Sequence, residues 1–207
     1  EAYRDSRIVA FSTGNVYPMV DVDGPHVTEQ VEPGALGEYA QSCLGRERMF
    51  EFFSEKYGTP GLSIRLNYAI DMRYGVLWDI GAKVFAGETI NLTAGHANVI
   101  WQGEANSRIL RCLRHCTTPA SPINITGPAL AVRDVAAAFG DIFGKDPAFE
   151  GTEDTRGWLV DASYSDELLG PLQVPVDVMI GWLADWISNG RENLNKPTAF
   201  DSRDGSF

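Results

Sequence analysis

The chain alternates short apolar runs with longer segments in which apolar residues recur every three or four positions. Short runs are typical of buried strands, and the longer repeats are typical of amphipathic helices. Strands are predicted at residues 7–13, 62–67 and 122–127, with shorter ones at 89–93, 98–102 and 148–150. Helices are predicted at residues 38–56, 75–86, 103–116, 132–143, 164–169 and 176–187. Strands joined through helices indicate an α/β fold with a parallel sheet.

The junction between the first strand and the first helix carries the candidate chemistry. The strand ends in Ser12, Thr13, Gly14 and Asn15, so hydroxyl groups lie at its carboxyl end. One face of the helix carries residues spaced by four, three, four and three: Tyr39, Cys43, Arg46, Phe50 and Phe53. A hydroxyl group should therefore face Tyr39 one turn into the helix. Ligands of open α/β sheets bind outside the carboxyl ends of the strands, which places the predicted site here.

These residues resemble a known family. The motif STGNVY, followed by Tyr-x-x-Ser on a helix, is similar to the NAD-dependent epimerase/dehydratases, the extended short-chain dehydrogenases. The resemblance runs from residue 7 to about residue 186 and rests on the order and spacing of short motifs. It implies that Thr13 and Tyr39 are catalytic and that Ser42 is the serine of the motif. The lysine that follows this serine in the family is Cys43 in this chain.

Cys43 changes the expected chemistry. A tyrosine has a reference pKa of about 10 and needs a neighbouring positive charge to act as a base near neutrality. In the family the lysine supplies this charge and holds the nicotinamide ribose, and a thiol does neither. Arg46 lies one turn further along and is the next basic residue on that face. Three interpretations stay open: an active Tyr39, a retained nucleotide fold with altered chemistry, or simple packing.

The resemblance also implies binding residues. Those assigned to the cofactor are Ser12, Tyr39, Cys43 and Asn67, and those assigned to the substrate are Asn15, Arg73 and Trp101. Arg73 suits a substrate carboxylate or phosphate, or else a surface loop. Trp101 stands where the family has a histidine, so its ring either stacks on a sugar or is buried at a domain junction.

A polar loop at residues 18–36 follows the first strand. The resemblance places it across the mouth of the active site, where Glu29 matches a recurrent acid. The alternative, a solvated loop acid, is the favoured interpretation of Glu29. His26 is expected to be exposed and has no predicted role. The acids of this loop lack the spacing of a calcium-binding loop, so no metal is predicted.

Composition limits the partners. The 207 residues are 44% hydrophobic and 22% charged, as in ordinary globular proteins. The net charge of −11 argues against nucleic-acid or anionic-membrane surfaces. No apolar run approaches the roughly 18 residues of a membrane span. The three cysteines do not suggest a disulfide framework, and they predict reduced thiols in a cytoplasmic protein.

A Rossmann domain opens with a glycine-rich turn after its first strand, and no such turn occurs here. The resemblance makes the first strand the fifth of the full sheet. We therefore expect a carboxyl-terminal portion, with on the order of a hundred residues absent upstream at about 30 per βαβ unit. One sheet edge and one face should then be open. The predicted divisions are a Rossmann half (1–70 and 102–127), a substrate domain (71–101 and 128–190) and a polar tail (191–207), which runs over the surface or is partly disordered.

The resemblance implies a nicotinamide-dependent epimerase, dehydratase or oxidoreductase that acts on a small molecule, a sugar derivative. NAD is the expected cofactor, and NADP is not excluded. The alternatives are a non-catalytic NAD-binding or sensing protein and a structural fragment without a ligand. A homodimer is also expected, because the family commonly pairs the tyrosine-bearing helix in its interface. The apolar residues for this contact are Leu44, Met49 and Phe52.

Overall fold

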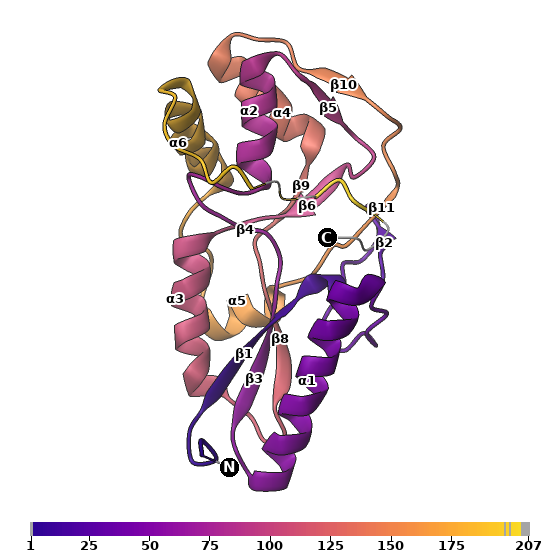
Figure 1. Ribbon diagram of the computed structural model, residues 1–207, viewed down its shortest axis with the longest axis vertical. Coiled ribbons are helices and arrows are strands. Elements are labelled where there is room, and N and C mark those ends of the chain that lie inside the picture. The colour runs from indigo at the N-terminus through magenta and orange to yellow at the C-terminus, as the bar shows by residue number, and fades with distance from the viewer. Residues whose placement is uncertain (1, 197, 199, 204–207) are drawn as a thin grey trace.

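A three-stranded parallel sheet with the strand order β1-β3-β8 organises the lower half of the molecule (Figure 1). The computed structural model describes residues 2–196, 198 and 200–203. Its sheet strands are β1 (Ile8–Thr13), β3 (Gly61–Leu66) and β8 (Ser121–Ile125). Parallel pairing in both ladders confirms the predicted α/β fold.

Helices cover both faces of this sheet (Figure 1). Helix α1 (Gly37–Tyr57) lies on one face, and α3 (Gln102–Cys112) and α5 (Ser163–Leu169) lie on the other. Side chains alternate along a strand, so β3 and β8 direct apolar residues toward α3 and α5. The cluster formed there includes Leu62, Ile64, Ile123, Ile125, Ile109 and Leu169. As predicted, α1 ends at a glycine, because Gly58 adopts a left-handed φ of 69°.

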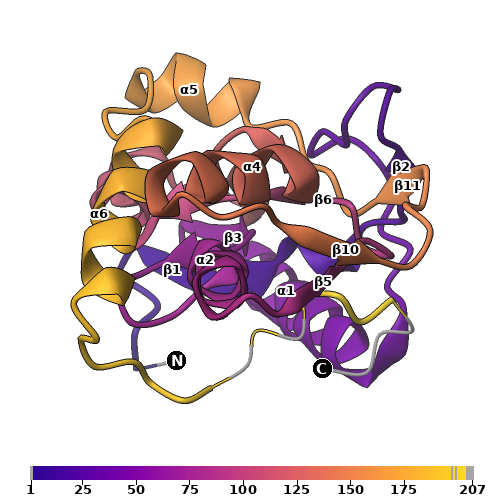
Figure 2. The same cartoon turned by 90° about the horizontal axis from the view of Figure 1, so that it is seen from above.

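The upper half is built around three helices. These are α2 (Val76–Ala86), α4 (Val132–Phe143) and α6 (Val176–Ser188), and Figure 2 shows α4 and α6 lying around α2. Their buried faces meet in one apolar cluster that includes Leu77, Ile80, Phe139 and Leu183. The bounds of α4 equal the predicted ones, and those of α2 and α6 differ by one residue.

Short strand pairs lie between the two halves and at the border of the upper half. β2 (Val20–Asp21) pairs with β11 (Arg156–Gly157), and β4 (Ala69–Ile70) pairs with β7 (Ile100–Trp101). β5 (Thr89–Asn91) pairs with β10 (Ala148–Glu150), and β6 (His96–Asn98) pairs with β9 (Ala129–Ala131). The sequence pattern predicted β5 and β10 but neither β2, β4, β9 nor β11, because strands this short carry little periodicity.

Two predicted elements differ from the structure. The strand expected at 98–102 is divided between β6 and β7, because the chain changes partners at Val99. The Val99 amide donates to the carbonyl oxygen of Pro128, and the next amide, from Ile100, donates to that of Tyr68. The helix expected at 103–116 ends at Cys112, and a 3₁₀ turn (Leu113–His115) follows it.

Part of the polar tail is packed against the upper half. Phe200 is only 9% exposed and belongs to the apolar cluster of that half. The Thr198 hydroxyl donates to the carboxylate of Asp79. Arg203 donates to the carbonyl oxygens of Thr93 and Arg156. The rest of the expected tail at 197, 199 and 204–207 lies outside the described residues.

The sheet has two open edges where one was expected. The expected open face is wrong, because helices lie on both faces of the sheet (Figure 1). Within the described part of the chain, β1 and β8 each pair on one side only. Phe11 on β1 is 52% exposed. None of the described helices is long and apolar enough to cross a membrane.

Candidate active site

The site begins in the turn that follows β1. Thr13 is buried, and its hydroxyl oxygen accepts a hydrogen bond from the Asn15 amide at 3.3 Å and lies 3.2 Å from the Asn15 side-chain oxygen. A threonine that accepts from an amide two residues later stabilises a tight turn, here the 3₁₀ turn Gly14–Val16. The sequence Thr-Gly-Asn therefore fixes the hydroxyl of Thr13 at the carboxyl end of the strand.

Asn67 packs against this turn from the end of β3. A Cβ atom added to Gly14 would lie 1.9 Å from Oδ1 of Asn67, so only glycine permits the approach. The Asn67 Nδ2 group donates to the carbonyl oxygen of Trp158 at 3.4 Å. Its Oδ1 atom is buried without a hydrogen-bond partner among the described residues. A buried amide with an unused acceptor at a strand end is a candidate ligand contact.

Tyr39 lies on the first turns of α1, and the structure brings it to Thr13 as predicted. The side chain is 46% exposed and hydrogen-bonds with Thr13. Burial raises the pKa of the Tyr39 phenol, and the hydrogen bond with Thr13 lowers it. The neighbouring Cys43 acts upward again, and the positive charge of Arg46 acts downward. The net direction is upward, so the protein as it stands favours the protonated phenol.

Cys43 connects Tyr39 to Arg46. Its thiol is 2% exposed and packs with Val16 and Tyr17. Arg46 donates from Nη2 to the Cys43 sulfur at 3.2 Å. The thiol therefore holds a cation one turn away. Cys43 itself acts to raise the pKa of Tyr39, and the positive charge of Arg46 acts to lower it.

The other predicted site residues have different surroundings. Ser12 donates its hydroxyl to the carboxylate of Glu47, beneath α1. Asn15 is half-buried in the turn beside Thr13. Arg73 forms an ion pair with Asp71 at 3.2 Å and is well exposed. Trp101 packs edge-on against Trp182, with ring centroids 5.4 Å apart.

The structure thus brings together Thr13, Asn15, Tyr39 and Cys43, and it places Asn67 against the same turn. Arg73 and Trp101 instead contact Asp71 and Trp182. Their assignment to a substrate stays a prediction, as does that of Asn15.

Glu29 was interpreted as a solvated loop acid, and the structure gives it a partner. Its Oε1 atom accepts from the backbone amide of Asn124 at 2.7 Å. Burial raises the pKa of the Glu29 carboxyl above its usual range, and the hydrogen bond from Asn124 opposes this shift. Loop 18–36 is therefore fixed to β8 by a carboxylate. His26 is half-buried rather than exposed.

Sequence reasoning missed a group of polar residues beneath α1. Glu47 and Arg65 form a buried ion pair with Nη2 and Oε2 2.7 Å apart. Tyr17 lies beside them, and its hydroxyl accepts from Nη1 of Arg65 at 2.7 Å. The available signal was an arginine in the middle of an otherwise apolar predicted strand, because a buried charge requires a partner.

The chain matches no family model, and no curated protein matches it. Solved structures do resemble it. The UDP-glucose 4-epimerase of Thermus thermophilus, complexed with NAD, superposes with a TM-score of 0.72 at 19% identity over 90% of this chain and 66% of that one. A dTDP-glucose 4,6-dehydratase from Bacillus anthracis in complex with NAD gives 0.76 at 15% identity, over 91% of this chain and 63% of that one. A UDP-N-acetylglucosamine 4-epimerase from Bacillus cereus gives 0.70 at 20% identity, over 88% and 65%.

At these identities the similarity establishes the fold, which is the Rossmann-like α/β fold of nucleotide-sugar epimerases and dehydratases. The chain spans less than two thirds of the length of these structures.

Proposed function

We propose that this chain belongs to an NAD-dependent epimerase, dehydratase or oxidoreductase that acts on a sugar derivative such as a nucleotide sugar. The observation that carries the proposal is the contact between Thr13 and Tyr39 at the carboxyl end of β1. A phenol and an alcohol that meet at this end of a parallel sheet can bind one substrate hydroxyl between them. The structures that share the fold support the same chemistry, since their names describe epimerases and dehydratases of nucleotide sugars.

In the proposed mechanism, Tyr39 accepts the proton of the substrate hydroxyl, and Thr13 hydrogen-bonds to the same oxygen. The exposed part of Tyr39 leaves room for a substrate to approach. Arg46 replaces the family's lysine as the positive charge that favours the phenolate. General acid–base catalysis of this kind contributes about 10²–10⁴-fold to a rate.

NAD is the proposed cofactor, with NADP not excluded, and several structures of this fold contain NAD. When bound, it supplies the hydride acceptor and donor of the reaction. The residues present fit the nicotinamide end of NAD. Among the described residues, the buried Oδ1 atom of Asn67 lies beside the turn and accepts no hydrogen bond, so it is available to a ligand. Ser12, Tyr39 and Cys43 are the other proposed contacts, although the Ser12 hydroxyl already binds Glu47. The sequence has no glycine-rich turn for the phosphates, so this chain supplies only part of a cofactor site.

The test is the Tyr39→Phe substitution in the intact protein. A panel of nucleotide sugars, sugars and sugar acids is first screened through the absorbance of NADH. With an active substrate, Tyr39→Phe should lower turnover by about 10²–10⁴-fold and leave NAD binding nearly unchanged. The matched control is Tyr164→Phe, at a tyrosine that is 49% exposed on α5. Equal turnover in the wild-type and Tyr39→Phe proteins would refute the catalytic assignment.

A second function is a non-catalytic NAD-binding or sensing protein of the same fold. The observation that favours it is the buried Cys43 in place of a lysine, together with the upward direction of the Tyr39 pKa. The substitution Cys43→Lys separates the two functions. In an enzyme it should raise turnover or move the pH optimum downward, because a nearby cation lowers the pKa of the phenol. In a sensor, the wild-type protein should turn over none of the sugars in the panel, and Tyr39→Phe should change no rate.

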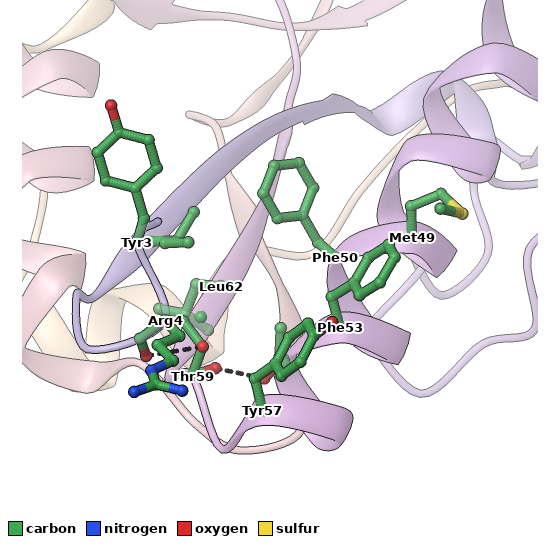
Figure 3. A pocket seen from close by; sticks show the side chains of 12 residues that line it. Tyr3, Arg4, Met49, Phe50, Phe53, Tyr57, Thr59 and Leu62 are labelled. Atoms are coloured by element: carbon green, nitrogen blue, oxygen red, sulfur yellow. Dashed lines mark hydrogen bonds between the residues drawn. The ribbon is translucent and has the colours of Figure 1, made fainter. Parts of the chain in front are cut away.

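The intact protein is proposed to be a homodimer that uses the outer face of α1. Met49 and Phe52 are each 55% exposed there, whereas Leu44, also predicted for this contact, packs partly inward against the cluster around Tyr17. An apolar pocket of about 310 Å³ lies beside Met49 and is lined by residues of α1, the N-terminal segment and β3. Figure 3 shows the side chains that line it.

Light scattering at increasing protein concentration tests this assembly. The wild type should be dimeric, and Met49→Glu should shift it toward the monomer. A wild type that stays monomeric at high concentration counts against the dimer. A cytoplasmic location is also proposed, because all three cysteines are free thiols.

A further inference from the structure

A row of polar side chains crosses the sheet beneath α1. Ser12, Arg65 and Asn124 are neighbours in the register of β1, β3 and β8. They are 7%, 4% and 0% exposed, so the row is buried along its whole length. Burying three polar side chains side by side is costly unless each is hydrogen-bonded. The hydrogen-bond partners of these three side chains therefore show which neighbouring elements the row fixes.

The centre of the row is the ion pair between Arg65 and Glu47 of α1. Nε of Arg65 donates to both carboxylate oxygens of Glu47, at 3.1 and 3.3 Å, and Nη2 donates to Oε2 at 2.7 Å. The two side chains are 5% and 10% exposed. A buried guanidinium and carboxylate in this fork geometry fix each other's position more rigidly than a lysine pair does.

The pair also holds both ends of the turn that carries Thr13. Before the turn, the Ser12 hydroxyl donates to the Glu47 carboxylate. After the turn, Nη1 of Arg65 donates to the hydroxyl oxygen of Tyr17 at 2.7 Å, and the guanidinium lies 4.6 Å from the centre of the Tyr17 ring. The Tyr17 hydroxyl in turn donates to Oδ1 of Asn124 at 2.9 Å. One ion pair thus fixes the residues on either side of the turn.

The same pair fixes the helix that carries Tyr39. Glu47 lies about two turns further along α1 than Tyr39, since a helical turn takes 3.6 residues. A shift of α1 along the sheet would separate Glu47 from Arg65 and leave buried charges unpaired, which is strongly unfavourable. The contact between Tyr39 and Thr13 therefore depends on where the ion pair sets α1 against β1.

We propose that Glu47 and Arg65 are positioning residues that keep Tyr39 and Thr13 at the distance that catalysis requires. They do so through their hydrogen bonds to Ser12 and Tyr17 on either side of the turn. We call these four residues the clamp. The proposal rests on the proposed function, because it treats the contact between Tyr39 and Thr13 as the catalytic one. It assigns no direct contact between the clamp and a substrate.

The test is Arg65→Lys in the intact protein. Lysine keeps the positive charge, but a single ammonium group cannot donate to Glu47 and Tyr17 in the same fork geometry. A misplacement on the order of 1 Å costs about 100-fold in rate, so we expect kcat to fall by roughly 10- to 100-fold. The KM for NAD should change by less than about twofold, because Arg65 itself is not among the proposed cofactor contacts. The matched control is Arg48→Lys, at an exposed arginine of α1, which should change neither value.

A spectroscopic measurement separates positioning from general stability. In protein labelled with ¹³C at the tyrosine ring, Tyr39→Phe identifies the Tyr39 signal among those of the seven tyrosines. Arg65→Lys should move this signal and the midpoint of its titration with pH, and Arg48→Lys should not. Tyr17→Phe removes the hydrogen bond between Arg65 and Tyr17 and leaves the ion pair. It gives the same test if Arg65→Lys does not fold.

The results distinguish the clamp from the proposed function. A Tyr39 signal that is unmoved in folded Arg65→Lys and Tyr17→Phe proteins overturns the clamp, whatever the activity. A moved signal with full turnover in Tyr39→Phe supports the clamp and refutes the catalytic role of Tyr39. A moved signal with the expected loss of kcat supports both.

Discussion

Replacing Glu47 by glutamine tests how much the buried ion pair contributes to folding. Glutamine has nearly the same shape and keeps one oxygen that accepts from Arg65 or Ser12. It removes the negative charge and leaves the Arg65 guanidinium, whose side chain is 5% exposed, without its counter-ion. Removing one partner of a buried pair costs about 3–5 kcal/mol. Because glutamine keeps part of the hydrogen bonding, we expect a loss near the lower end, about 3 kcal/mol.

This loss should be visible in unfolding experiments. For a domain of this size, 1 kcal/mol corresponds to roughly 2–4 °C in Tm, so about 3 kcal/mol predicts a decrease of roughly 6–12 °C. Urea unfolding, followed by the fluorescence of the five tryptophans, gives the free energy directly. The loss should persist in high salt, because a buried pair is screened much less than an exposed one.

Two further variants complete the design. Glu51→Gln removes an exposed carboxylate one turn further along α1 and should change stability by less than about 0.5 kcal/mol. Glu47→Gln combined with Arg65→Met removes both charges and should recover part of the loss, because apolar replacement of a whole buried pair is often neutral. A decrease below about 1 kcal/mol in Glu47→Gln, or a double variant no more stable than the single one, would show that the pair is not held as tightly as its geometry indicates.

Three further predictions follow from individual contacts. Glu29 has a raised pKa in the folded state, so its contribution to stability is fully present below the unfolded pKa and is lost as the pH rises through the folded one. Glu29→Gln should remove this pH dependence in urea titrations at a series of pH values, and Glu29→Ala should cost about 1–3 kcal/mol by leaving the Asn124 amide unpaired. Gly14→Ala should displace Asn67 and weaken NAD binding measured by calorimetry, with a stability loss of about 1–3 kcal/mol, and unchanged affinity would contradict the role of Asn67. Phe200→Ala should cost about 3–5 kcal/mol and speed proteolysis of the tail, and an unchanged cleavage rate would show that the tail is not docked.

The sequence by itself determined the elements whose pattern is local. Helix α4 has the predicted bounds, because an amphipathic helix repeats its apolar positions within a dozen residues. The strands of the sheet and the meeting of Thr13 with Tyr39 were also predicted. A hydroxyl at a strand end and a tyrosine in the next helix are close whenever a parallel sheet forms, so the main part of the candidate site could be expected from the order of elements.

Only the tertiary structure decided which distant residues are partners. Glu47 and Arg65 belong to different elements, and the Tyr17 hydroxyl reaches Asn124 across 107 positions of the sequence. These contacts depend on the register of three strands and on the position of α1 over them, neither of which leaves a periodic signal in the chain. The partner of Glu29 was hidden for the same reason. A loop acid and an acid bound to a backbone amide look alike in sequence, and they differ only in what the fold places beside them.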